Sequence, residues 1–325
     1  MVPFNRDTPG DEVMRAYSSE ILGKTVLITG PSEKGIGGET AIYMAAGKPK
    51  LLLLAGRNLS KIQPVIDKIN KQHPDVAVSF IHLDLADQSS VRKAAKQAAA
   101  EIDQLDILIN NAGVMAIPKY TTTVDGIEMQ FGANHIGHFL LTNLLMEKIL
   151  ASGPGARIIN VSSFSYIYGG VRFDDWNFKN GVEYNQWLGY SQSKSANYLF
   201  TEALADKLKS KGVLAFAVNP GFITESNLQS NSGITDEMFR EGYALTLKVL
   251  NGAPMPALLP KSLAAGTSTT IYAALEPNLR DHSNAVLSDC AIFDEPLMEH
   301  ARGADKAEKL WALSEKLVGE KFEYS

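Results

Sequence analysis

Short apolar runs alternate along the chain with longer stretches in which apolar and polar residues mix at helical spacing. Runs of about four to eight apolar or β-branched residues are typical of strands that are buried on both faces. Strands are expected at residues 25–29, 51–58, 77–85, 105–109, 157–163, 213–219 and 285–292. Helices are expected at residues 39–46, 60–71, 89–101, 126–150, 187–211, 236–250, 261–275 and 305–318.

The alternation of strand and helix predicts the fold class. Parallel strands joined by right-handed helical crossovers form an open sheet, and small molecules bind at the carboxyl ends of its strands. We therefore predict an α/β fold, with a doubly wound parallel sheet of about seven strands flanked by helices. A single domain is expected over residues 1–325, because no low-complexity linker marks a boundary.

Three segments interrupt the alternation. Residues 1–20 read as a polar N-terminal arm, and residues 164–189 read as a loop rich in Tyr, Trp, Phe and Asp that overhangs the site. In residues 222–259, Asn, Ser, Gly and Pro interrupt helical pieces. Segments of this kind commonly close over substrates and exclude water, so a substrate lid is expected after the sixth strand.

Charge and cysteine content narrow the functional classes. A formal net charge of −5 disfavours nucleic acid or an anionic membrane as the main partner. No apolar run approaches the roughly 20 residues of a membrane span, and residues 1–7 lack the pattern of a secretory signal. The single cysteine, Cys290, has no partner for a disulfide and reads as a structural thiol. A cytoplasmic protein is expected.

A glycine-rich segment, residues 30–38, separates the first strand from a helix. Glycines let the backbone turn tightly and let a pyrophosphate approach the amide groups and the positive end of the helix. The alternative is a simple strand-to-helix turn. The second strand ends in a base, Arg57, where an acidic residue would hold the ribose of NAD. Arg57, helped by Lys34, predicts NADP rather than NAD, unless it is only an exposed loop arginine.

Tyr190 and Lys194 lie four residues apart in a predicted helix, so they project from the same face. A nearby ammonium favours phenolate, so we expect the pKa of Tyr190 to fall from about 10 toward neutrality, which suits proton transfer. A surface Tyr and Lys on an amphipathic helix are the alternative. Ser163 ends the fifth strand without the elbow or base that a nucleophile needs, which favours a hydrogen-bonding role.

Two histidines, His135 and His138, are three residues apart in a predicted helix. No third ligand lies nearby in the sequence, and no carboxylate completes a metal set. We interpret them as packing or hydrogen-bonding residues and predict no metal site.

Taken together, these motifs resemble the short-chain dehydrogenase/reductase family over roughly residues 22–320. The family's pattern has a T-G-x-x-x-G-x-G loop, N-N-A-G after the fourth strand, a serine, Y-x-x-x-K and P-G. The matching positions are 29–37, 110–113, 163, 190–194 and 220–221. Residues 134–139, 190–200 and 310–315 resemble the branch that contains retinol dehydrogenases and related NADP-dependent reductases. One departure is visible, because four residues rather than three separate Gly30 from Gly35, so the loop should bulge near the adenosine phosphate.

The resemblance implies a Rossmann-type fold and roles for individual residues. Tyr190 would be the general acid or base, Ser163 would bond the same substrate oxygen, and Lys194 would lower the tyrosine pKa and hold the nicotinamide ribose. Asn134 would hold a water that connects Lys194 to solvent. The residues implied in cofactor binding are Gly30, Ser32, Lys34, Gly35, Ile36, Gly37, Arg57, Asp84, Leu85, Asn111, Ala112, Gly113, Tyr190, Lys194, Pro220, Gly221, Ile223 and Thr224.

The predicted function is an NADP(H)-dependent oxidoreductase that transfers a hydride between nicotinamide and a carbonyl or secondary alcohol of an organic metabolite. Two alternatives stay open: an enzyme acting on a C=C bond or performing a redox-neutral rearrangement, and a non-catalytic nucleotide-binding regulator. The substrate is expected to be a partly apolar small molecule. The resemblance also implies a homodimer or homotetramer.

Overall fold

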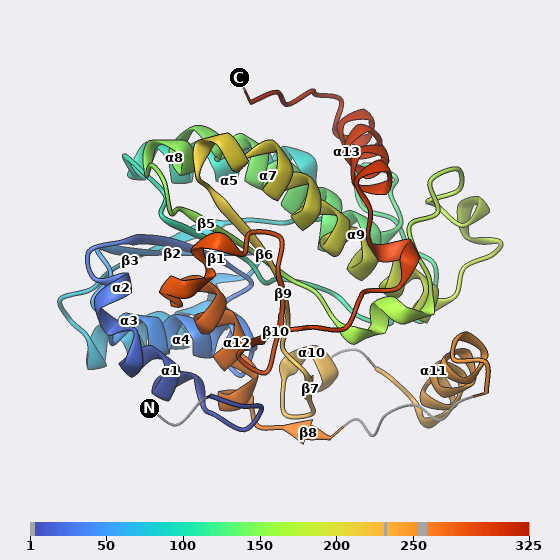
Figure 1. Ribbon diagram of the computed structural model, residues 1–325, viewed down its shortest axis with the longest axis horizontal. Helices are drawn as coiled ribbons and strands as arrows, with labels where there is room; N and C mark the ends of the chain where they lie inside the picture. The colour runs from blue at the N-terminus through green and yellow to red at the C-terminus, as the bar shows by residue number, and fades with distance from the viewer. Residues whose placement is uncertain (1–3, 231–232, 253–258, 325) are drawn as a thin grey trace.

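The computed structural model of the chain describes residues 4–230, 233–252 and 259–324. Its centre is an eight-stranded sheet with the strand order β10-β9-β6-β5-β4-β1-β2-β3 (Figure 1). All neighbours in this sheet are parallel except β9 and β10, which form an antiparallel hairpin. The strands are β1 (Thr25–Thr29), β2 (Leu51–Gly56), β3 (Ala77–His82), β4 (Ile107–Asn110), β5 (Arg157–Val161), β6 (Leu214–Asn219), β9 (Val286–Ser288) and β10 (Ala291–Ile292).

Burial explains why the apolar runs became the inner strands. Every residue of β1, β5 and β6 is buried, as expected for strands that are covered on both faces, whereas the edge strand β3 is mostly half-buried or exposed. The predicted α/β fold with a mainly parallel, doubly wound sheet is confirmed.

Helices cover both faces of the sheet, and each face has its own apolar core (Figure 1). One layer contains α1 (Gly10–Ala16), α3 (Ile36–Ala45), α4 (Leu59–Gln72) and α12 (Leu263–Leu275). The other contains α5 (Gln88–Glu101), α7 (Gly137–Leu144), α9 (Gln186–Lys207) and α13 (Ala304–Val318). The shorter helices are α2 (Ser18–Ile21), α6 (Met129–Phe131) and α8 (Met146–Ala151).

Three predicted elements differ in the structure. The polar arm expected at 1–20 contains α1 and α2, because Val13, Met14 and Ile21 form an apolar face that is fully buried. The single helix expected at 126–150 is divided into α6, a π-helical segment at Gly132–Ile136, α7 and α8. The single strand expected at 285–292 is the β9–β10 hairpin, because Asp289 and Cys290 take positive φ angles and turn the chain back.

The segment after β6 contains β7 (Phe222–Ile223), α10 (Asn227–Ser230), α11 (Asp236–Val249) and β8 (Pro260–Lys261), and β7 pairs with β8 in a separate two-stranded sheet. Residues 231–232 and 253–258 of the expected lid at 222–259 lie outside the described residues. The lid therefore stays a prediction, as does the single domain over 1–325. Among the residues that are described, no helix is long and apolar enough to cross a membrane.

The strand order reverses between β1 and β4. From β1 the chain builds outward through β2 and β3, and from β4 it builds outward in the other direction through β5 and β6. In open α/β sheets a crevice forms at this reversal, beyond the carboxyl ends of the strands, and it is the usual place for a ligand.

Candidate active site

A cavity of about 1100 Å³ lies at the reversal of strand order. Residues at or just beyond the carboxyl ends of six strands line it. These are Gly30 after β1, Arg57 after β2, Leu83 after β3, Asn111 after β4, Ser163 after β5 and Pro220 after β6. The cavity is therefore built by the topology, because β1 to β6 run parallel to one another and end at the same edge of the sheet.

The glycine-rich loop forms one wall of the cavity and packs tightly on the neighbouring turn. Gly30 has a φ of +66°, and a Cβ there would lie 2.8 Å from the Cβ of Ala112. A Cβ on Gly37 would lie 2.4 Å from Nδ2 of Asn111. Side chains at these positions would push the loop away from the 110–113 turn, so both glycines are required by close approach.

The extra residue of the loop is accommodated by a tight turn. Lys34 has a φ of +57°, and the amide of Gly35 donates to the carbonyl of Ser32 over 3.1 Å. The expected bulge therefore lies at residues 32–35, directly before α3 begins at Ile36. The backbone of Lys34 faces the segment after β7, because its carbonyl accepts from the amide of Asn227 over 3.1 Å.

The end of the cavity beyond β2 carries positive charge. Arg57 and Lys61 both line it, and both are exposed. Neither cation forms an ion pair with any described residue, so both are available to an anion. Lys61 was not singled out from the sequence; its position in the first turn of α4, four residues after Arg57, could have identified it.

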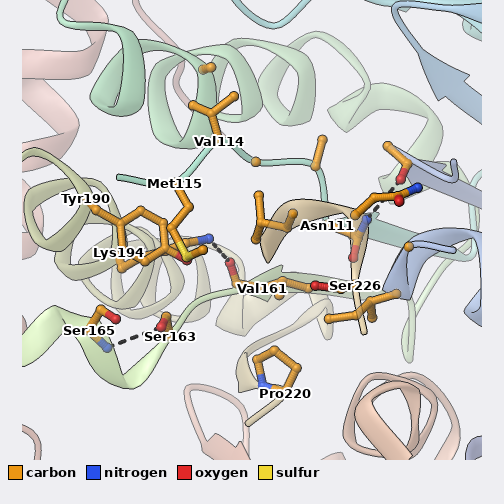
Figure 2. Close-up of a pocket in the computed structure, with 18 of the residues that line it drawn as sticks. Asn111, Val114, Met115, Val161, Ser163, Ser165, Tyr190, Lys194, Pro220 and Ser226 are labelled. Carbon is orange, nitrogen blue, oxygen red and sulfur yellow. Dashed lines mark hydrogen bonds between the residues drawn. The ribbon is translucent and has the colours of Figure 1, made fainter. Parts of the chain in front are cut away.

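Tyr190, Lys194 and Ser163 meet on the opposite side of the cavity, from α9 and the end of β5 (Figure 2). The ammonium of Lys194 lies 5.6 Å from the centre of the Tyr190 ring and donates to the carbonyl of Val161 over 2.9 Å. Ser163 bonds with Tyr190 as well. The structure thus brings together three of the four residues predicted to be catalytic.

The expected fall in the pKa of Tyr190 is wrong for this state of the protein. Burial raises the pKa of Tyr190 to about 12, and the bond with Ser163 offsets only part of this effect. Burial also lowers the pKa of Lys194 to about 8. Spacing places the two groups together, but removal from water outweighs their proximity, because the lysine is turned toward Val161.

Asn134, the fourth predicted residue, does not line the cavity. It is fully buried in the π-helical segment, and its side chain holds the backbone of Val114, accepting from the amide over 2.8 Å and donating to the carbonyl over 2.9 Å. It also donates to the hydroxyl of Ser193 over 2.9 Å. π-Helical turns are rare and are often found at functional sites.

Most of the predicted cofactor-binding residues line the cavity. These are Gly30, Ser32, Gly35, Ile36, Arg57, Asp84, Leu85, Asn111, Ala112, Gly113, Tyr190, Lys194, Pro220, Gly221 and Ile223. Lys34, Gly37 and Thr224 are not among the lining residues. Gly37 acts through its packing on Asn111, as described above.

The mouth of the cavity beside Tyr190 is apolar and aromatic. Trp187 lies one turn before Tyr190, and its indole N–H donates to the carbonyl of Met238 in α11 over 2.8 Å. A Cβ on Gly242 would lie 3.2 Å from the Trp187 ring, so α11 packs directly on it. This contact places Phe239 and Tyr243 at the cavity, with 44% and 52% of their surfaces exposed. None of these residues was predicted individually; only the aromatic loop at 164–189 and the segment at 222–259 were.

The chain is similar in sequence to short-chain dehydrogenases. The short chain dehydrogenase family model matches residues 24–176. The chain is 39% identical to human retinol dehydrogenase 13 over 299 residues, covering 92% of this chain and 86% of that protein. It is 38% identical to mouse retinol dehydrogenase 12, covering 94% and 89%.

Solved structures agree on the fold. A crystal structure of an uncharacterized protein from Mycobacterium paratuberculosis has a TM-score of 0.68 at 30% identity and covers 94% of this chain and 98% of that chain. A short chain dehydrogenase from Burkholderia cenocepacia, solved in complex with NADP, has a TM-score of 0.62 at 22% identity, covering 82% and 96%.

Proposed function

The chain belongs to the short-chain dehydrogenase/reductase family, in a branch that resembles the retinol dehydrogenases, and we propose that it transfers a hydride between NADP(H) and a carbonyl or alcohol of an apolar metabolite. The observation that carries this proposal is the meeting of Tyr190, Ser163 and Lys194 in a cavity that also contains the glycine-rich loop and Arg57. A proton-transfer group and a dinucleotide site share one space.

The residues of the cavity fit a dinucleotide. The glycine-rich loop and the first residue of α3 line the cavity, and the N–H groups of a helix's first turn suit a pyrophosphate. Arg57 and Lys61 are cations without an acidic partner among the described residues, which suits the extra phosphate of NADP. When bound, the nicotinamide supplies the hydride.

The chain's own residues handle the proton. Tyr190 gives its proton to the carbonyl oxygen in reduction, or takes it from the alcohol in oxidation, while Ser163 bonds the same oxygen. Burial raises the pKa of Tyr190 to about 12, so the phenol carries its proton at neutral pH. Lys194 would hold the nicotinamide ribose. Asn134 fixes the Val114 backbone and would hold the water that links Lys194 to solvent.

The apolar mouth supports a moderately large, partly apolar substrate. Phe239 and Tyr243 line the same cavity as Tyr190 and are partly exposed, while the buried Trp187 packs beneath α11, and aromatic surfaces bind extended apolar molecules well. The relatives are named for retinol, an apolar alcohol. The cysteine content also favours a reducing compartment such as the cytoplasm, and the family resemblance implies a homodimer or homotetramer.

The proposal is tested with purified protein, NADPH or NADH, and a series of aldehydes, ketones and alcohols. We expect oxidation of NADPH with an apolar carbonyl compound and loss of turnover in Tyr190→Phe, with cofactor binding kept. Transfer of deuterium from 4-labelled NADPH to the carbonyl carbon distinguishes this reaction from reduction of a C=C bond or a redox-neutral rearrangement. Turnover or biological function that survives Tyr190→Phe would instead support the non-catalytic regulator.

A further inference from the structure

His138 is a buried histidine of α7 whose two ring nitrogens both have partners. Only 2% of its surface is exposed. Nδ1 lies 3.0 Å from the carbonyl oxygen of Asn134, and Nε2 lies 2.9 Å from the hydroxyl of Thr29, the last residue of β1. His135, three residues earlier and fully buried, has a partner among the described residues only at Nε2, which lies 2.8 Å from the hydroxyl of Ser314. The two histidines are therefore not equivalent.

The partners of His138 fix which nitrogen carries the proton. A carbonyl can only accept, so Nδ1 carries the hydrogen and donates to Asn134. Burial and, to a smaller extent, the charge of Lys194 lower the pKa of His138 to about 4 despite the opposing hydrogen bond with Asn134, so the ring is neutral at physiological pH. Nε2 therefore has no hydrogen and accepts from the hydroxyl of Thr29.

Thr29 extends this chain of bonds to the 110–113 turn. Its hydroxyl oxygen accepts from the amides of Asn111 and Ala112 over 2.9 and 3.0 Å. The other acceptor near the Thr29 hydroxyl is the carbonyl of Ile109, at the longer distance of 3.4 Å. With two amides donating to its oxygen, Thr29 cannot receive a proton from His138, so the chain of bonds ends there and serves to hold positions, not to conduct protons.

This series of hydrogen bonds runs from Asn134 to the amides of Asn111 and Ala112, and Asn134 also contacts the same turn near Gly113. Asn134 holds Val114 by two hydrogen bonds. A Cβ on Gly113 would lie 3.2 Å from Oδ1 of Asn134 and 3.8 Å from Nζ of Lys194. The 110–113 turn is thus held from one side by Thr29 and from the other by Asn134, with Lys194 alongside.

We propose that His138 is a positioning residue that locks the 110–113 turn to the π-helical segment, so that the cofactor-binding turn and Lys194 keep one relative position. The role rests on the proposed function, because the turn lines the cavity that we assign to NADP(H). The bond to Thr29 holds the 110–113 turn, which lies on the cofactor side, and the bond to Asn134 holds the π-helical segment, which lies on the side of Lys194.

Three substitutions distinguish the contribution of the bond to Thr29 from that of the bond to Asn134. His138→Phe keeps a ring of similar shape and removes both. His138→Asn keeps a donor to the carbonyl four residues earlier, a geometry already present in α7, where Nδ2 of Asn143 donates to the carbonyl of Phe139 over 2.8 Å. His138→Asn cannot reach Thr29. His135→Phe is the matched control, because it removes a histidine that is equally buried but does not contact the turn.

The readouts are the Kd of NADPH, kcat, and hydrogen exchange of the Asn111 and Ala112 amides without cofactor. For His138→Phe we expect a Kd about tenfold higher, a kcat about tenfold lower and faster amide exchange, as follows from the loss of a buried hydrogen bond on each side. His138→Asn should restore kcat to within about threefold of wild type while Kd and exchange stay raised. His135→Phe should change neither Kd nor exchange.

Two results would overturn the proposal. One is a Kd and exchange rate in both His138 variants that match wild type. The other is an equal loss in all three variants that follows only their melting temperatures. If His138→Phe does not fold, His138→Asn decides alone by its Kd. If wild-type protein binds no NADPH, the proposed function fails, and amide exchange at 111–112 in His138→Asn still decides whether His138 holds the turn.

Discussion

Lys194 has an environment that makes cofactor binding depend on pH in a calculable way. Burial lowers its pKa to about 8, so the side chain loses its proton as the pH rises through about 8. If the ribose of NADPH is held by the ammonium form only, the Kd is constant below pH 7 and rises as the fraction of ammonium falls. The Kd should then be about tenfold higher at pH 9 than at pH 7.

Lys194→Met removes the ammonium and keeps an unbranched side chain of similar length. A hydrogen bond to a charged group contributes about 1.5–3 kcal/mol, so binding should weaken by about tenfold to a hundredfold at pH 7. The decisive expectation is that this variant loses the pH dependence, so its Kd is the same at pH 7 and pH 9. Fluorescence titration with NADPH at constant ionic strength measures both effects.

Lys61→Met is the matched control, since Lys61 is a cation that lines the same cavity but lies far along it from Tyr190, in the first turn of α4. It should weaken NADPH binding while keeping the rise in Kd between pH 7 and pH 9. A wild-type Kd that is constant up to pH 9, or a rise that persists in Lys194→Met, would refute the assignment of Lys194 to the ribose.

Three further predictions follow from the same cavity and its supports. Arg57→Ala should raise the Kd of NADPH by about tenfold to a hundredfold and leave that of NADH unchanged; equal losses for both cofactors would argue against a phosphate contact. Phe239→Ala with Tyr243→Ala should raise KM for long apolar carbonyl substrates but not for short ones, which steady-state kinetics over a chain-length series would show. Glu128 is buried, and burial raises its pKa to about 7, so the folded protein should lose about 3 kcal/mol of stability as the pH rises from about 4.5 to above 7. Urea unfolding at pH 5 and pH 8 should show that loss in wild type but not in Glu128→Gln, with Glu101→Gln, at an exposed position, behaving as wild type.

The fold and the meeting of Tyr190, Ser163 and Lys194 in one cavity could be predicted because their signals are local. A continuous apolar run in the sequence, as in β2, indicates a buried strand. The motif residues come directly after these strands, and the parallel topology brings the strand ends together at one cavity. The α1 helix was missed because its apolar residues are few and flanked by charges, although Val13 and Met14 are fully buried against the rest of the core. Its helicity depends on packing against α12 and α3, which no local pattern contains.

Contacts between distant segments account for what was missed in the site. Trp187 lies in α9 and Gly242 lies in α11. Only the contact between them shows that α11 packs against the turn of α9 that precedes Tyr190. The sequence left packing and hydrogen bonding open for His138, and its partner Thr29 lies 109 residues earlier in the chain. The spacing of His135 and His138 in the helix could not distinguish them, because the difference lies in which neighbour each ring nitrogen meets.

The pKa of Tyr190 shows why spacing alone misjudges chemistry. Four residues of helix place a phenol and an ammonium on one face, but the interaction depends on how far the charge lies from the hydroxyl and on how much water both have lost. Here the ammonium is held by Val161, and burial dominates, so the phenol keeps its proton and the lysine is the group that titrates near neutrality. Under the proposed function, Tyr190 in this protonated state acts first as a proton donor. Its pH dependence in the reductive direction should therefore follow Lys194 and cofactor binding, not the ionisation of the tyrosine itself.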